Sequence, residues 1–145
     1  NIMIPYGPTF GDHFIQGSVS DVDFEKKEVT VSPEVGNYSY THLIIAVGSR
    51  GPFPGKSDAK TQEDVRKSYS ELASELDKSS DIVIVGGGPV GVELAGEIAE
   101  RYSSKFVTLI HPNKDLASKR YTSEGFQNKM KKRLKHFTVE VVQGK

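Results

Sequence analysis

The sequence predicts an α/β fold in which a parallel sheet follows an antiparallel β-meander. Strand-like segments without an intervening helix fill residues 17–48, which favours antiparallel pairing. A glycine-rich turn between an apolar strand and a helix follows within residues 81–98. Beyond this turn, strand and helix patterns alternate up to residue 142, as is typical of a parallel sheet.

The composition argues against several functional classes. The 145 residues carry 19 basic and 19 acidic side chains, so no net charge attracts nucleic acid or an anionic surface. The sequence has no cysteine, which excludes a thiolate metal site within it and suits a reducing, intracellular compartment. No apolar run approaches the ~18 residues of a membrane span. Because the chain starts at Asn1 and stops soon after its last strand pattern, we expect a fragment of a longer protein.

The elements before the glycine turn follow from local patterns. Residues 1–16 mix proline, glycine and aromatic side chains without a sustained period, so they predict a loop with room for one short strand. The meander is expected over residues 17–24, 28–31 and 40–48, with turns at 25–27 and 36–37. Residues 49–60 contain several prolines and glycines and predict a linker.

Helical and strand patterns then alternate. A helix is expected from Thr61, which precedes Asp64 by three residues as in a capping box. Its apolar stripe consists of Val65, Tyr69, Leu72 and Leu76. Residues 82–85 are all β-branched, which predicts a strand buried on both faces. Later strands are expected at 106–110 and 137–142, separated by a helix near 123–136 with Phe126, Met130 and Leu134 on one face.

The glycine turn carries the main functional signal. Gly86, Gly88 and Gly91 form G-x-G-x-x-G between a strand and a helix, which predicts a Rossmann-type nucleotide-binding unit. The first glycine allows the tight turn, the second lets the backbone approach a pyrophosphate, and the third lets the helix pack on the strand. The alternative is a tight turn without a ligand. The candidate cofactor-binding residues here are Gly86, Gly87, Gly88, Pro89, Val90 and Gly91.

His111 is a further candidate for cofactor binding, because it ends the second parallel strand. An NAD-specific fold has Asp or Glu near this position to accept the ribose hydroxyls. Histidine cannot make that paired contact and does not repel a 2′-phosphate, so we expect both NADH and NADPH to bind, with Lys114 near the phosphate. A solvated histidine at a strand end remains the alternative.

A basic cluster marks the last expected helix. It consists of Lys129, Lys131, Lys132, Arg133 and Lys135. The cluster is compatible with three roles: a solvated helix face, contact with an anionic membrane surface, and non-specific nucleic-acid binding. Spacing favours neither of the two binding hypotheses.

The apolar stretch at residues 43–48, preceded by Tyr40 and followed by Ser49 and residues 52–55, resembles the second flavin-contacting motif of two-dinucleotide flavoproteins. The core of that motif is Ala-Thr-Gly, and Val47 stands where threonine is usual, which loses a hydroxyl but keeps the β-branch. Residues 10–17, 51–56 and 107–111 are similar to the apoptosis-inducing-factor-like, mitochondria-associated branch, also called the ferroptosis suppressor flavoproteins. The resemblance spans nearly the whole chain.

The resemblance implies a flavoenzyme that takes hydride from NAD(P)H onto FAD and passes electrons to a quinone or another small acceptor. Residues 1–55 would belong to an incomplete FAD domain and residues 56–145 to the NAD(P)H-binding domain. Ala46, Val47 and Gly48 would approach FAD through their backbone, and Val19 would bind its adenine. Glu93, expected in the first helical turn, is the candidate catalytic contact because its carboxylate would face the nicotinamide. A simple helix-dipole interaction of ~0.3–1 kcal/mol is its alternative role.

The resemblance also bears on binding and location. The fragment alone is expected to bind FAD poorly, because the motif for the FAD pyrophosphate would precede Asn1. Cytoplasmic or membrane-associated locations fit the branch, including the mitochondrial outer surface, lipid droplets and the plasma membrane. Two other functions stay open: an NAD(P)H-responsive binding module in apoptosis-type signalling through membrane or DNA contact, and another two-domain flavoprotein reductase. The oligomeric state is also left open.

Overall fold

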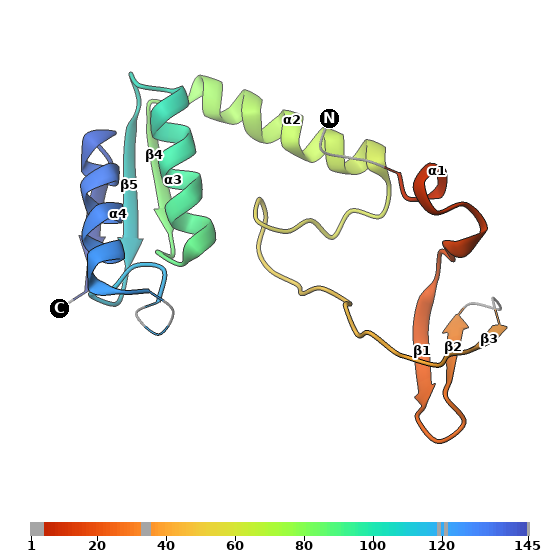
Figure 1. The fold of residues 1–145 in the computed structure, drawn as a ribbon. Coiled ribbons are helices and arrows are strands. Elements are labelled where there is room, and N and C mark those ends of the chain that lie inside the picture. Colours follow the sequence, from red (N-terminus) through yellow and green to blue (C-terminus); the bar gives the residue numbers. More distant parts are fainter. Residues whose placement is uncertain (1–4, 33–35, 119, 121, 145) are drawn as a thin grey trace. The chain divides into compact units, whose positions relative to one another are not determined.

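The computed structural model describes residues 5–32, 36–118, 120 and 122–144. The chain contains two compact units, Asn1–Arg50 and Gly51–Lys145, each with its own three-stranded sheet (Figure 1). The assignment of residues 1–55 to FAD binding and 56–145 to NAD(P)H binding stays a prediction.

The first unit is an antiparallel meander. Its strands β1 (Ser18–Asp23), β2 (Glu28–Ser32) and β3 (Gly36–Ser39) pair in the order β1-β2-β3. The side chain of Asp23 builds the turn after β1, because its Oδ1 accepts hydrogen bonds from the N–H groups of Glu25 (3.0 Å) and Lys26 (2.8 Å). The predicted antiparallel arrangement is therefore confirmed.

Two expectations for the first unit are wrong. Among residues 5–16, helix α1 (Gly7–Phe10) and the 3₁₀ helix η1 (Gly11–His13) replace the expected loop and strand, while residues 1–4 lie outside the described residues. A proline in the first turn of α1 loses no helical hydrogen bond there. The third strand is β3, within which a turn was expected, and residues 41–50 form no strand. β3 takes the place beside β2 that this apolar segment was expected to occupy, and among the described residues the segment pairs with no strand.

The second unit begins with helix α2 (Gln62–Lys78). The Thr61 hydroxyl caps this helix as predicted, accepting from the Asp64 N–H (3.1 Å) and donating to the Asp64 carboxylate (2.6 Å). Of the apolar stripe of α2, Leu76 packs against the core of the unit, whereas Tyr69 donates a hydrogen bond to the carbonyl of Pro54 (2.8 Å).

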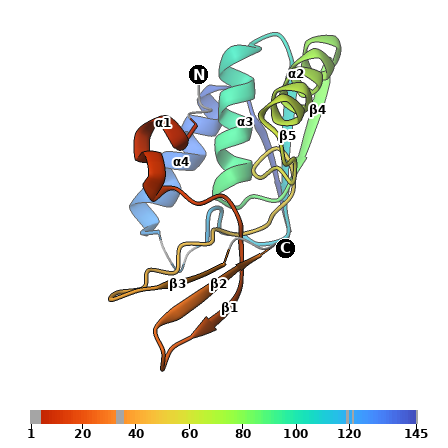
Figure 2. The ribbon, with the colours of Figure 1, turned by 90° about the vertical axis from the view of Figure 1, so that its right-hand side faces the viewer.

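A parallel sheet forms the centre of the second unit. Strands β4 (Asp81–Val85), β5 (Phe106–His111) and β6 (Glu140–Gln143) lie in the order β4-β5-β6 and are all parallel, as predicted. Helices α3 (Pro89–Arg101) and α4 (Glu124–His136) connect them and lie beside the strands (Figure 2). The core joins buried residues of both helices to the sheet and contains Ile84, Ala95, Ile98, Ala99, Val107, Leu109, Leu116, Leu134 and Val139.

Three details of this unit differ from the predictions. Strand β4 is buried on one face only: Ile84 lies in the core, whereas Val85 on the other face is 82% exposed. The last strand begins at Glu140, because Phe137 caps α4 and Thr138 adopts a left-handed turn with φ 58°. On α4, Phe126, Met130 and Leu134 line one groove, as their predicted shared face requires, but Phe126 is exposed and the neighbouring Gln127 is buried.

Candidate nucleotide-binding site

The glycine turn joins β4 to α3 in the predicted order. Gly86 has φ 114°, a backbone conformation that side chains rarely allow, so a glycine is required where the chain leaves the strand. A Cβ on Gly91 would lie 1.8 Å from the carbonyl oxygen of Gly86. Only glycine therefore lets helix α3 approach the turn this closely, which is the packing role expected of the third glycine.

Gly88 differs from its neighbours because nothing in the protein requires it to be glycine. Its φ is −71°, and a Cβ there would meet no atom within 4 Å. The first helical hydrogen bond runs from the Val92 N–H to the Gly88 carbonyl (3.0 Å), so the amides of Val90 and Gly91 precede it. Open space beside amide donors at a positive helix end fits a pyrophosphate.

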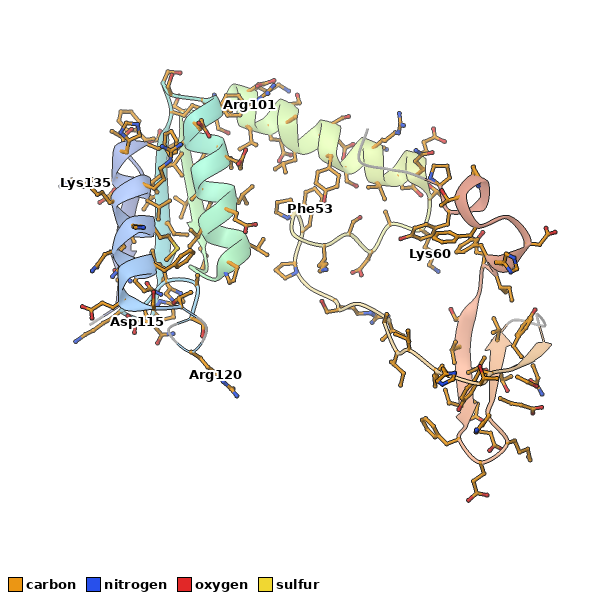
Figure 3. The ribbon with its side chains drawn as sticks, in the orientation of Figure 1. Phe53, Lys60, Arg101, Asp115, Arg120 and Lys135 are labelled. Atoms are coloured by element: carbon orange, nitrogen blue, oxygen red, sulfur yellow. The ribbon has the colours of Figure 1, made fainter. Side chains whose placement is uncertain are left out.

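A pocket of about 510 Å³ lies next to this helix end. The loop between β5 and α4 lines it with Asn113, Lys114, Asp115, Ser118 and Arg120. Figure 3 labels Asp115 and Arg120 on this loop, at the opposite end of α3 from Arg101. In doubly wound sheets, ligands bind at the carboxyl ends of the strands, so the pocket has the position expected for the adenosine part of a dinucleotide.

His111 ends β5 as predicted, and its ring is bonded to the glycine turn. Its Nδ1 accepts a hydrogen bond from the N–H of Gly87 (3.1 Å), and the side chain lines the same pocket as Lys114. Nδ1 is therefore occupied within the protein, which leaves Nε2 as the ring nitrogen for a ligand.

Sequence reasoning missed three residues that support the turn. The N–H of Ala117 donates to the Gly87 carbonyl (2.7 Å), and Leu116 packs against Gly87. Gln127, which is 5% exposed, hydrogen-bonds the backbone of Leu116. One signal in the sequence was Gly87 itself, a glycine at a position that the G-x-G-x-x-G pattern leaves free.

Glu93 is not in the first turn of α3, where it was expected. The helix begins at Pro89, so Gly91 is already helical and Glu93 lies in the second turn. It is exposed and lines a groove of about 520 Å³ between α3 and α4. The helix-dipole role weakens at this position, because the effect fades beyond the first turn. The contact with nicotinamide stays a prediction.

The residues expected to contact FAD all lie in the first unit. Val19 is an exposed residue of β1 and pairs with Val31, while Ala46, Val47 and Gly48 lie in the segment that forms no strand. The strand that the resemblance requires at residues 43–48 is thus not formed in the described chain. The flavin contacts stay a prediction.

The comparisons with known proteins agree with the glycine turn and the parallel sheet. The sequence profile of the pyridine nucleotide-disulphide oxidoreductases matches residues 11–145. The chain belongs to this family. This is the class of FAD- and NAD(P)H-dependent oxidoreductases that the two motifs predicted, which confirms the expected family and its cofactors.

Two curated relatives carry the name of the flavoproteins that the resemblance indicated. Ferroptosis suppressor protein 1 of Taeniopygia guttata is 43% identical over 116 residues, which cover 79% of this chain and 31% of that protein. The protein of the same name from Homo sapiens is 41% identical over 118 residues, which cover 81% of this chain and 31% of that protein. The chain therefore spans about a third of the length of these relatives. Membership in an apoptosis-inducing-factor-like branch stays a prediction.

Solved structures share the fold at low sequence identity. A ferredoxin reductase from Rhodopseudomonas palustris has a TM-score of 0.67 at 17% identity and covers 98% of this chain and 36% of its own. The water-forming NADH oxidase from Lactobacillus brevis, bound to NADH, has a TM-score of 0.57 at 23% identity. The match covers 88% of this chain and 29% of that protein. These likenesses confirm the predicted α/β class with its Rossmann-type sheet.

Proposed function

We propose that this chain is part of a flavoenzyme that transfers hydride from NAD(P)H to FAD and electrons onward to a quinone, with residues 56–145 in its NAD(P)H-binding domain and residues 1–55 in its FAD domain. The observation that carries the proposal is the glycine turn, in which the open side of Gly88 adjoins the leading amides of α3. Family membership supports the oxidoreductase class. The quinone acceptor rests on the resemblance to the ferroptosis suppressor flavoproteins.

Each part of the site has a proposed task. The amides of Val90 and Gly91 donate to the pyrophosphate, and Gly88 gives it room. The loop after β5 receives the adenosine, with Lys114 beside a 2′-phosphate, so both NADH and NADPH are accepted. Glu93 faces the nicotinamide and orients its ring. The bound cofactors supply the hydride chemistry themselves, so no side chain is assigned a proton transfer.

Contact with an anionic membrane surface is proposed for α4, where a lipid-soluble quinone would be available. Lys131 donates to the carbonyl of Lys114 (3.0 Å), whereas Lys132 and Lys135 are exposed. Among the described residues, no helix combines the length and apolar character needed to cross a bilayer. Flotation with phosphatidylserine vesicles should therefore fall in the double variant K132Q/K135Q, and unchanged flotation would contradict the contact.

Titration calorimetry of the chain with NADH tests the nucleotide site. Gly88→Ala places a methyl group where the pyrophosphate is proposed to lie, and we expect at least an order of magnitude loss of affinity with an unchanged circular dichroism spectrum. Gly125→Ala is the control, because Gly125 lies in the first turn of another helix, α4, and its Cβ would meet only the Ser123 Oγ at 4.0 Å. Wild-type affinity in Gly88→Ala, or equal losses in both variants, would contradict the proposal.

A further inference from the structure

The peptide groups on both sides of Gly87 are held by residues far along the chain. The Gly87 N–H donates to His111 Nδ1 (3.1 Å), and the Gly87 carbonyl accepts from the Ala117 N–H (2.7 Å). A Cβ on Gly87 would lie 2.5 Å from Leu116 Cδ2 and 2.8 Å from His111 Cγ. The middle of the turn is therefore enclosed by the end of β5 and the loop that follows it.

That loop is itself fixed from helix α4. The buried Gln127 accepts a hydrogen bond from the Leu116 N–H through Oε1 (3.1 Å) and donates through Nε2 to the Leu116 carbonyl. Its Nε2 also donates to the Thr122 hydroxyl (2.7 Å). Leu116 is fully buried, so the residue beside the turn has little freedom to move.

These contacts determine how the next amide points. Because a peptide group is planar and trans, the Gly88 N–H points opposite to the Gly87 carbonyl, which Ala117 holds. The bond from Gly87 to His111 fixes the preceding peptide group in the same way. Two successive peptide planes are thus oriented before the leading amides of α3.

We propose that His111 is a positioning residue for the dinucleotide, holding the Gly87 amide rather than recognising the ribose. The inference rests on the proposed function, because it assigns a task within the same site. An accepting Nδ1 requires the ring to carry its hydrogen on Nε2. The ring acts through the glycine turn, whereas a carboxylate at this position would act on the ribose hydroxyls directly.

Two amide substitutions, each reaching the position of one ring nitrogen, separate the roles of Nδ1 and Nε2. In His111→Asn, the side-chain oxygen can lie where Nδ1 now accepts from Gly87. In His111→Gln, the longer side chain places its amide near the position of Nε2. A positioning role requires the asparagine variant to behave like the wild type, whereas ribose recognition through Nε2 requires the glutamine variant to do so.

The experiment measures hydrogen exchange of the Gly87 amide in the unliganded chain and NADH affinity by calorimetry, for wild type, His111→Asn, His111→Gln and His111→Ala. We expect His111→Asn to keep both within about twofold, and the other two variants to lose Gly87 protection and NADH affinity by about tenfold, the scale of one hydrogen bond. Circular dichroism checks that each variant is folded.

The outcomes separate this inference from the proposed function. Wild-type Gly87 protection in His111→Ala, or wild-type affinity in His111→Gln together with a loss in His111→Asn, would overturn the positioning role. A wild-type chain that binds no NADH would overturn the nucleotide site as a whole. In that case, the exchange of Gly87 in the unliganded variants still decides whether His111 holds the turn.

Discussion

The two units of the chain are stabilised in different ways. Among the described residues of the first unit, Val31 is the buried apolar side chain, and Ile44 (87%) and Val47 (85%) are largely exposed. The second unit contains the whole of the core cluster around Leu109. The meander is therefore specified by backbone pairing and turns, and the parallel sheet by packing. The proposed nucleotide site lies on the unit whose own core can hold a turn in place.

The largest expected effect is that of Gly91→Ala. Its Cβ would overlap the Gly86 carbonyl, so either the helix or the turn must move, and we expect a loss of more than about 4 kcal/mol in the free energy of unfolding of the second unit. Amide exchange of β2 should stay as in the wild type, because the meander does not depend on that core. Thermal unfolding of the second unit at the wild-type temperature would contradict this account.

A pair of core substitutions tests the contrast between the units directly. Leu109 is fully buried, so Leu109→Ala should lower the stability of the second unit by about 2–5 kcal/mol. Val31 is buried but does not belong to the larger core cluster, so Val31→Ala should cost the meander only the transfer free energy of two methyl groups, about 1.5 kcal/mol. Exchange-derived stabilities of β5 and β2 give the two values. Equal losses would mean that the units are packed alike.

The sequence predicted the fold best where a segment packs or pairs with other described elements. The glycine turn, the cap at Thr61 and the parallel strands follow from short-range patterns, and all of them were found. The prediction of a strand at residues 40–48 was wrong, because an apolar run forms a strand only where a neighbouring strand pairs with it. The prediction that β4 is buried on both faces was wrong for a related reason, since α3 and α4 pack on only one face of the sheet.

The candidate site was predictable in outline and not in its supports. The spacing of Gly86, Gly88 and Gly91 indicated the turn, but the contacts that hold Gly87 join residues 24 positions or more apart. A glutamine among lysines on α4 gave no signal that Gln127 would be the buried member of that face. Such polar contacts depend on tertiary structure, which periodicity does not encode.

A smaller effect is expected at the start of α2. Thr61→Ala removes the acceptor of the Asp64 N–H and should destabilise the helix by about 1 kcal/mol. Thr61→Ser keeps the hydroxyl and serves as the control. Because α2 contributes only partly buried side chains to the core, exchange should increase in the first turns of α2 and not in β5. A similar increase in β5 would show that α2 and the sheet unfold together.

The smallest effect concerns the turn of the meander and depends on pH. The backbone N–H and the ammonium group of Lys26 hold the pKa of Asp23 below its ordinary value of 3.8. A folded-state pKa below the unfolded one stabilises the hairpin while the carboxylate is ionised, so this contribution is complete above the ordinary value and is lost as the pH falls through the lowered one.

Asp23→Asn keeps an oxygen that can accept from the turn amides but removes the charge, so its hairpin should have a flatter pH dependence in the acid range. Chemical shifts of Val22 and Val29, which face each other across β1 and β2, follow the hairpin from about pH 6 to about pH 2.5 in both proteins. The ion pair is exposed, so the difference should be small and should shrink further in high salt. Identical acid profiles would mean that backbone pairing alone determines the stability of the meander, which would make the contrast with the packed unit sharper still.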